Sequence, residues 1–154
     1  MTDTLKSICE QCTHLHNPQL DFIPREAERQ RQIILQDLKE LVSAGALERE
    51  KTVIVLAGAL FESLLYCLLQ AQEGYIASRR GSFTFDPEQN LDNYVNIFNR
   101  WFSELLTIPD IVVEYRNMVH MNRELKFPPD IRERAARDMV RFLAALLGKL
   151  AESF

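Results

Sequence analysis

The stretch Val53–Leu69, VIVLAGALFESLLYCLL, constrains the fold of this chain more than any other. A helix that is apolar all round must be surrounded by other helices or by lipid. Glu62 lies near the middle of this stretch, where a charge is costly in lipid, and the stretch is at the lower length limit for a span. We therefore expect a central bundle helix over residues 46–72 and no membrane. A buried Glu62 would need an arginine or tyrosine partner from another helix.

The composition indicates an all-α domain. The chain has 154 residues, 47% of them hydrophobic and 26% charged, and only five glycines and six prolines. Such a chain is long enough to bury a core without stabilising disulfides or metal ions. Because it has few glycines and prolines, it is expected to contain few turns and therefore few, long helices. We expect a single domain, 1–154, folded as an up-and-down bundle of four core helices with one or two additional helices.

Apolar periodicity and turn residues place six helices. We expect Thr2 or Asp3 to cap the first helix, Pro24 to occupy a favourable first helical position of the second, and Ala44-Gly45 to end the second, with Ile33 facing inward. Residues 74–89 are expected to form a loop whose Phe83 and Phe85 cover an edge of the core. The expected helices span residues 4–16, 25–43, 46–72, 91–106, 111–125 and 131–150.

Cys9, Cys12, His14 and His16 raise the question of a metal site. The Cys-x-x-Cys half is typical of zinc sites, but no second pair follows at a suitable distance. Cys9 and Cys12 also share an apolar stripe with Leu5, where a thiol behaves as a small apolar group. We favour core cysteines and expect no metal or other cofactor. Three cysteines without an export signal favour a reducing, cytoplasmic setting.

The charge distribution gives only a weak indication of a nucleic-acid partner. The net charge is −4 overall, but residues 1–115 carry ten Lys/Arg against 17 Asp/Glu, whereas residues 116–149 carry eight against four. The basic C-terminal third could meet a phosphate backbone, although basic helix faces are more often simply solvated.

The segment Ile111–Leu125, IVVEYRNMVHMNREL, contains the side chains best suited to catalysis or ligand binding. Arg116 and His120 are four apart, so on one continuous helix they would lie on the same face. His120 could serve as a general acid or base on RNA, and Arg116 could neutralise the scissile phosphate. Asn117 could orient the phosphate or the His120 imidazole through hydrogen bonds. One His–Arg pair supplies few groups for general acid–base catalysis. A homodimer that brings two copies of the pair together would complete the site.

The string EYRNMVHMNREL resembles the Arg-Asn-x-x-His signature of the HEPN superfamily, and VLAGALFESLLYCLL is similar to its apolar, Glu-containing helix. This resemblance implies a HEPN-like bundle that dimerises through the side bearing the motif. Many members are metal-independent endoribonucleases of toxin–antitoxin, defence or RNA-processing systems, often paired with a nucleotidyltransferase or antitoxin. Others are non-catalytic binding modules.

Three hypotheses follow for this face. The first is a ribonuclease in which His120 is the acid or base, Arg116 binds phosphate and Asn117 positions it. The second, which we favour, is a non-catalytic homodimer that binds a partner protein, RNA or a nucleotide-like ligand, with Arg123 and Glu62 as further binding residues. The cleaving members place four to six residues between Arg and His, whereas this chain has three. The third makes Arg116 structural, paired with Glu62 or Glu114, and makes His120 a helix-capping or interface residue.

Overall fold

The computed structural model describes residues 3–154 and confirms an all-α helical bundle, with no β-strand in that part of the chain. A 3₁₀ turn, Arg25–Ala27, precedes α3. The helices are α1 (Leu5–Gln11), α2 (Thr13–His16), α3 (Glu28–Ala46), α4 (Glu50–Ala71), α5 (Glu73–Arg80), α6 (Leu91–Phe102), α7 (Ile111–Asn117), α8 (Met121–Glu124) and α9 (Ile131–Ser153).

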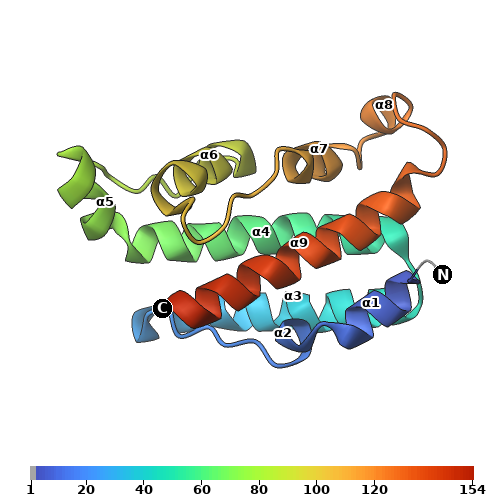
Figure 1. Ribbon diagram of the computed structural model, residues 1–154, viewed down its shortest axis with the longest axis horizontal. Coiled ribbons are helices and arrows are strands. Elements are labelled where there is room, and N and C mark those ends of the chain that lie inside the picture. The colour runs from blue at the N-terminus through green and yellow to red at the C-terminus, as the bar shows by residue number, and fades with distance from the viewer. Residues whose placement is uncertain (1–2) are drawn as a thin grey trace.

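The chain passes along the bundle four times (Figure 1). It runs out in α3, back in α4, out again through α6 and α7, and back in α9, so the third limb consists of two short helices. Helices α1 and α2 lie against α3 and α9, while α5 extends the end of α4. This is the expected up-and-down course of four limbs with additional helices.

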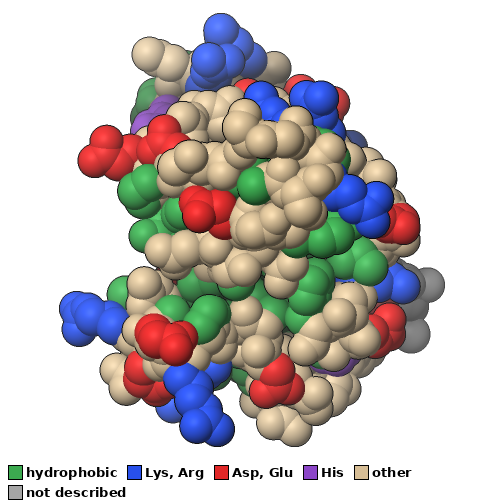
Figure 2. Space-filling view, turned by 90° about the vertical axis from the view of Figure 1, so that its left-hand side faces the viewer, with side chains coloured by type: hydrophobic (Ala, Val, Ile, Leu, Met, Phe, Trp, Pro, Cys, Tyr) green, Lys and Arg blue, Asp and Glu red, His purple; other side chains and the backbone are tan. Residues whose placement is uncertain are grey.

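Helix α4 is the centre of the hydrophobic core. It packs against α3, α5, α6, α7 and α9. Within residues 3–154 it is the one helix long and apolar enough to cross a membrane, yet 61% of its most apolar window is buried inside the bundle. That burial is what the core helix of a helical bundle requires. At the end of the bundle that carries α5, acidic and basic side chains are intermingled around exposed apolar groups (Figure 2).

The first expected helix is interrupted. Residues 4–16 form two helices because Cys12 takes an extended conformation, with φ −86° and ψ 91°. The cap is Thr4, whose side chain accepts a hydrogen bond from the Ser7 N–H at 3.1 Å, so the prediction of Asp3 was wrong. Thr2, the other expected cap, lies outside the described residues.

The second expected helix differs at both ends. Pro24 is not the first helical residue, because its backbone is extended at φ −60° and ψ 155°. The α-helical part begins at Glu28, after the 3₁₀ turn, and Ile33 is 44% exposed rather than inward. Gly45 does not end the helix. It lets α1 approach, since a Cβ there would lie 2.4 Å from the Cys9 sulfur.

The actual stop after α3 is a Schellman motif built on Glu48. The Arg49 N–H donates to the Ala44 carbonyl and the Glu48 N–H to the Gly45 carbonyl, each at 3.0 Å. Glu48 has φ 53°, a left-handed conformation that glycine usually supplies at this position. Helix α4 therefore begins at Glu50 rather than Ala46.

The expected loop 74–89 was wrong over its first half, where α5 forms and ends at Gly81 with φ 92°. The remaining loop does cover a core edge: the Phe85 ring contacts Tyr66 and Tyr94 at centroid distances of 4.9 and 5.9 Å. Helix α6 ends at Phe102 rather than residue 106. The Asn99 side chain holds the following loop through two hydrogen bonds with the Ile108 backbone, at 2.8 and 2.9 Å.

We expect Glu48→Gly to raise the free energy of unfolding by about 1 kcal/mol, because it removes the left-handed strain of a residue with a side chain. Urea denaturation measures this change. The control Glu48→Ala keeps the strain while removing the carboxylate, and should not be stabilised. A gain from the alanine variant equal to that from glycine would contradict the backbone explanation.

Candidate functional site

The segment 111–125 is not one helix, and this changes the site. Helix α7 ends at Asn117, residues 118–120 form a turn, and α8 begins at Met121. His120 is the N-cap of α8, with an extended backbone at φ −88° and ψ 136°. The prediction that Arg116 and His120 share a helix face was therefore wrong, because the i,i+4 relation places side chains together only within a continuous helix.

Arg116 crosses α4 at Gly58. A Cβ added at Gly58 would lie 2.6 Å from the Arg116 Cγ and 3.3 Å from its Cβ, so the missing side chain is what allows α7 to lie this close. One turn further along α4, the Arg116 Nη2 donates to the Glu62 Oε2 at 3.1 Å. The arginine stem thus packs over the glycine, and its guanidinium reaches the carboxylate beyond.

The Arg116–Glu62 pair confirms that Glu62 has an arginine partner on another helix. The pair is not buried, since the two side chains are 41% and 36% exposed. Exposed pairs of this kind contribute about 0–1 kcal/mol to stability. The pair therefore fixes the direction of the guanidinium more than it stabilises the fold, and leaves part of both groups accessible.

Tyr115 attaches α7 to α9. Its hydroxyl donates to the Asp138 Oδ2 at 2.9 Å, and the side chain is 4% exposed. Burial, with a further contribution from Asp138, raises the pKa of the Tyr115 hydroxyl. The neutral phenol is therefore the favoured state, and it donates this hydrogen bond at ordinary pH. Helix α7 is thus held on α4 by Arg116 and on α9 by Tyr115.

The other predicted site residues lie beyond the end of α7. Asn117 is the last residue of α7 and is half-buried, whereas His120 and Arg123 are exposed. Helix α8 is held by Glu124, which pairs with Arg132 of α9 and lies 3.7 Å from the Lys51 Nζ of α4. Of the predicted residues, the structure brings only Arg116 and Glu62 into contact within the described chain.

A pocket of about 420 Å³ lies beside Glu62, between α3 and α4. Its wall includes Gln30, Ile33, Ser63 and Tyr66. Sequence reasoning missed these residues as part of a site. The available signal was that Glu62, Ser63 and Tyr66 are the polar residues of the apolar stretch 53–69. Tyr66 follows them by four and three residues, so all three face one side of the helix.

The cysteine-rich N-terminal segment packs into the bundle. Cys9 is buried, Cys12 is half-buried, and the His16 ring nitrogen lies 2.8 Å from the Cys9 carbonyl oxygen. His14 lies over Gly148 of α9. Over residues 3–154, no three His, Cys, Asp or Glu side chains are grouped as metal ligands. This arrangement fits the interpretation of Cys9 as a core residue.

No family model, curated protein or solved structure matches this chain. The function must therefore be argued from the geometry of these residues.

We predict that Gly58→Ala lowers the free energy of unfolding by about 1–2 kcal/mol. Overpacking at the α4–α7 crossing costs about 1–3 kcal/mol, and the better helix propensity of alanine returns up to about 1 kcal/mol. The matched control is Gly74→Ala in α5, where a Cβ meets nothing within 4 Å and which should gain stability. Chemical denaturation of both variants tests the crossing, and equal gains in the two would refute it.

We predict slow alkylation of Cys9 and Cys67 by iodoacetamide in the native protein at pH 8. Burial raises the pKa of each thiol to about 11, so about one molecule in a thousand carries the reactive thiolate. The pKa of Cys12 is raised as well, but its exposure is greater. Peptide mass spectrometry should show Cys12 modified first. Equal rates at Cys9 and Cys12 would mean that the N-terminal helices do not stay packed.

Proposed function

We propose that this chain is a non-catalytic, HEPN-like binding module that forms a homodimer through the α4–α7 face. The observation that carries this proposal is the Arg116–Glu62 pair, which presents one cation and one anion side by side at 41% and 36% exposure. Beside the pair lie the exposed apolar side chains of Ile33 and Ala59. A rim of charge next to exposed apolar groups is the composition of many protein interfaces.

The same geometry disfavours RNA cleavage within one chain. A phosphate-binding arginine and a general acid or base must act on the same phosphate group. Arg116 is instead occupied by Glu62, and His120 belongs to a different helix after a turn. A two-fold pair of opposite charges also suits an isologous dimer, because each arginine can meet the partner's glutamate.

The setting is proposed from the resemblance to the HEPN superfamily. We propose a cytoplasmic protein of an RNA-related or toxin–antitoxin defence system. Its partner would be an antitoxin or a nucleotidyltransferase, and RNA or a nucleotide would be the ligand class. Asn117, the last residue before the turn 118–120, and Arg123 of α8 are the further residues proposed to contact such a ligand.

We expect the purified chain to sediment as a dimer and Ala59→Arg to sediment as a monomer. The variant adds a bulky cation beside Glu62 on the exposed stripe of α4. Ala145→Arg on α9 is the matched control, since it is also an exposed alanine within a long helix, and it should remain dimeric. Sedimentation equilibrium distinguishes them. A monomeric wild-type protein, or dissociation of both variants, would contradict the proposed dimer face.

The alternative is a metal-independent endoribonuclease, favoured by the exposure of His120 together with Arg123 and Lys126 on one short segment. It requires that dimerisation bring Arg116 and His120 of different chains together. Incubation of the protein with a single-stranded RNA pool in EDTA tests it. Cleavage that is abolished by both His120→Ala and Arg116→Ala would establish the nuclease. An absence of cleavage at high protein concentration would rule out the nuclease and favour the non-catalytic binding module.

A further inference from the structure

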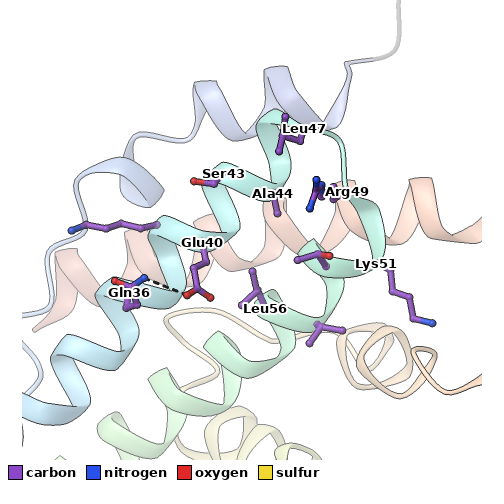
Figure 3. Close-up of a pocket in the computed structure, with 11 residues that line it drawn as sticks. Gln36, Glu40, Ser43, Ala44, Leu47, Arg49, Lys51 and Leu56 are labelled. Carbon is purple, nitrogen blue, oxygen red and sulfur yellow. Dashed lines mark hydrogen bonds between the residues drawn. The ribbon is translucent and has the colours of Figure 1, made fainter.

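A second concave surface lies at the other end of the α3–α4 pair. It is a groove of about 700 Å³ between the C-terminal half of α3 and the start of α4 (Figure 3). Ala44 and Leu47 line its α3 side, and Leu56 and the Glu40 carboxylate face the space between the helices. None of the residues of the α4–α7 face lines this groove.

Its apolar groups are unusually open to solvent. Leu47 is 65% exposed and Val55 is 47% exposed, although both belong to the lining. Leu47 is the residue that follows α3, and Val55 lies in the second turn of α4. Single exposed apolar residues are common, but two that line the same groove make it a candidate binding surface.

The left-handed turn at Glu48 places the side chains of Glu48 and Arg49 on different sides of the chain. Glu48 lies on the side of α1, where its carboxylate is 3.5 Å from the Lys6 N–H. Arg49, the next residue, lines the groove instead, together with Lys39 and Lys51. Glu40 is the single acidic side chain in the lining, and the Gln36 amide donates to it at 3.3 Å. The rim of the groove is therefore basic, in a chain whose net charge is −4.

We propose that this groove binds an acidic amphipathic helix of a partner protein. Two packed helices leave a groove between them that accepts the ridge of a third helix. Apolar side chains of the ligand would contact Leu47, Val55 and Leu56, and its glutamates would meet Lys39 and Arg49. Lys51 also lines the groove, but its Nζ lies 3.7 Å from the Glu124 carboxylate. Charge complementarity selects this occupant, since Lys39 and Arg49 outnumber Glu40, the single acidic side chain of the lining.

Two other occupants are less consistent with the groove. A flat anionic membrane surface would not reach a concave floor, and Glu40 faces that floor. A second copy could offer α8, whose Met121 and Leu125 are 70% and 75% exposed, but that segment also carries Arg123 and Lys126. Like charges would then face each other. Both occupants are distinguished by the experiment below.

The probe is a synthetic helix of about 18 residues, long enough to span about 27 Å. It carries leucines on one face and glutamates beside them, and its twin has lysine at every glutamate position. Fluorescence anisotropy of the labelled peptides measures binding to the full chain, and amide chemical shifts locate it. We expect the acidic helix to bind with shifts at residues 36–56, and the basic twin to bind at least about tenfold more weakly.

Two variants and a control sharpen the test. Val55→Asp should weaken binding at least about tenfold, whereas Ala145→Asp, which adds the same charge on an exposed position of α9, should not. The double variant Lys39→Glu, Arg49→Glu should bind the basic twin in preference. Circular dichroism and thermal melting confirm that each variant is folded.

Several outcomes would overturn the proposal. These are no binding of the acidic helix, equal binding of its twin, or shifts confined to other helices. If the protein bound vesicles of phosphatidylcholine and phosphatidylserine more tightly than the acidic helix, and Val55→Asp abolished this binding, the occupant of the surface would be a membrane. Dissociation by Val55→Asp of a dimer that survives Ala59→Arg would indicate a second copy in the groove. Because Ala59→Arg tests the dimer separately, failure of the groove and failure of the α4–α7 dimer are distinguishable.

Discussion

The burial of α4 is the constraint on which the rest of this structure depends. Its apolar sides cannot face water, so α3, α6, α7 and α9 cover them and α5 closes one end. Only one stripe of the helix stays accessible, which includes Val55, Ala59 and Glu62. The pocket beside Glu62 and the basic groove both lie along this stripe. The two surfaces for which we propose a function therefore both border the part of the central helix that the bundle leaves uncovered.

The crossing at Gly58 links the core to the site. Because the glycine lets α7 lie directly on α4, the Arg116 stem occupies space that a side chain would otherwise fill. The guanidinium then meets Glu62, and Tyr115 on the same short helix reaches Asp138 of α9. Arg116 is thus both a packing residue and a surface charge. A structural role and an interaction role are compatible here, since the stem serves one and the half-exposed tip the other.

Periodic patterns predicted the long helices well and the short ones poorly. The apolar stripes of α4, α6 and α9 were recognised because many core contacts repeat at helical spacing. The break at residues 118–120 was missed because no glycine or proline marks it, and α8 is instead positioned by the contacts of Glu124 with Arg132 and Lys51. Gly45 was misinterpreted as a stop for the opposite reason: its role is the close approach of Cys9, and Glu48 makes the turn.

The sequence by itself determined the fold class and the central helix, and it pointed to an arginine or tyrosine partner for Glu62 if that residue were buried. Each of these follows from local composition and from the cost of exposing apolar surface or isolating a charge. Only the tertiary structure decided that Arg116 is that partner, that Glu62 stays half-exposed, and that His120 leaves the helix of Arg116. These outcomes depend on how closely distant segments approach, and contacts between residues 54 positions apart leave no periodic trace in the chain.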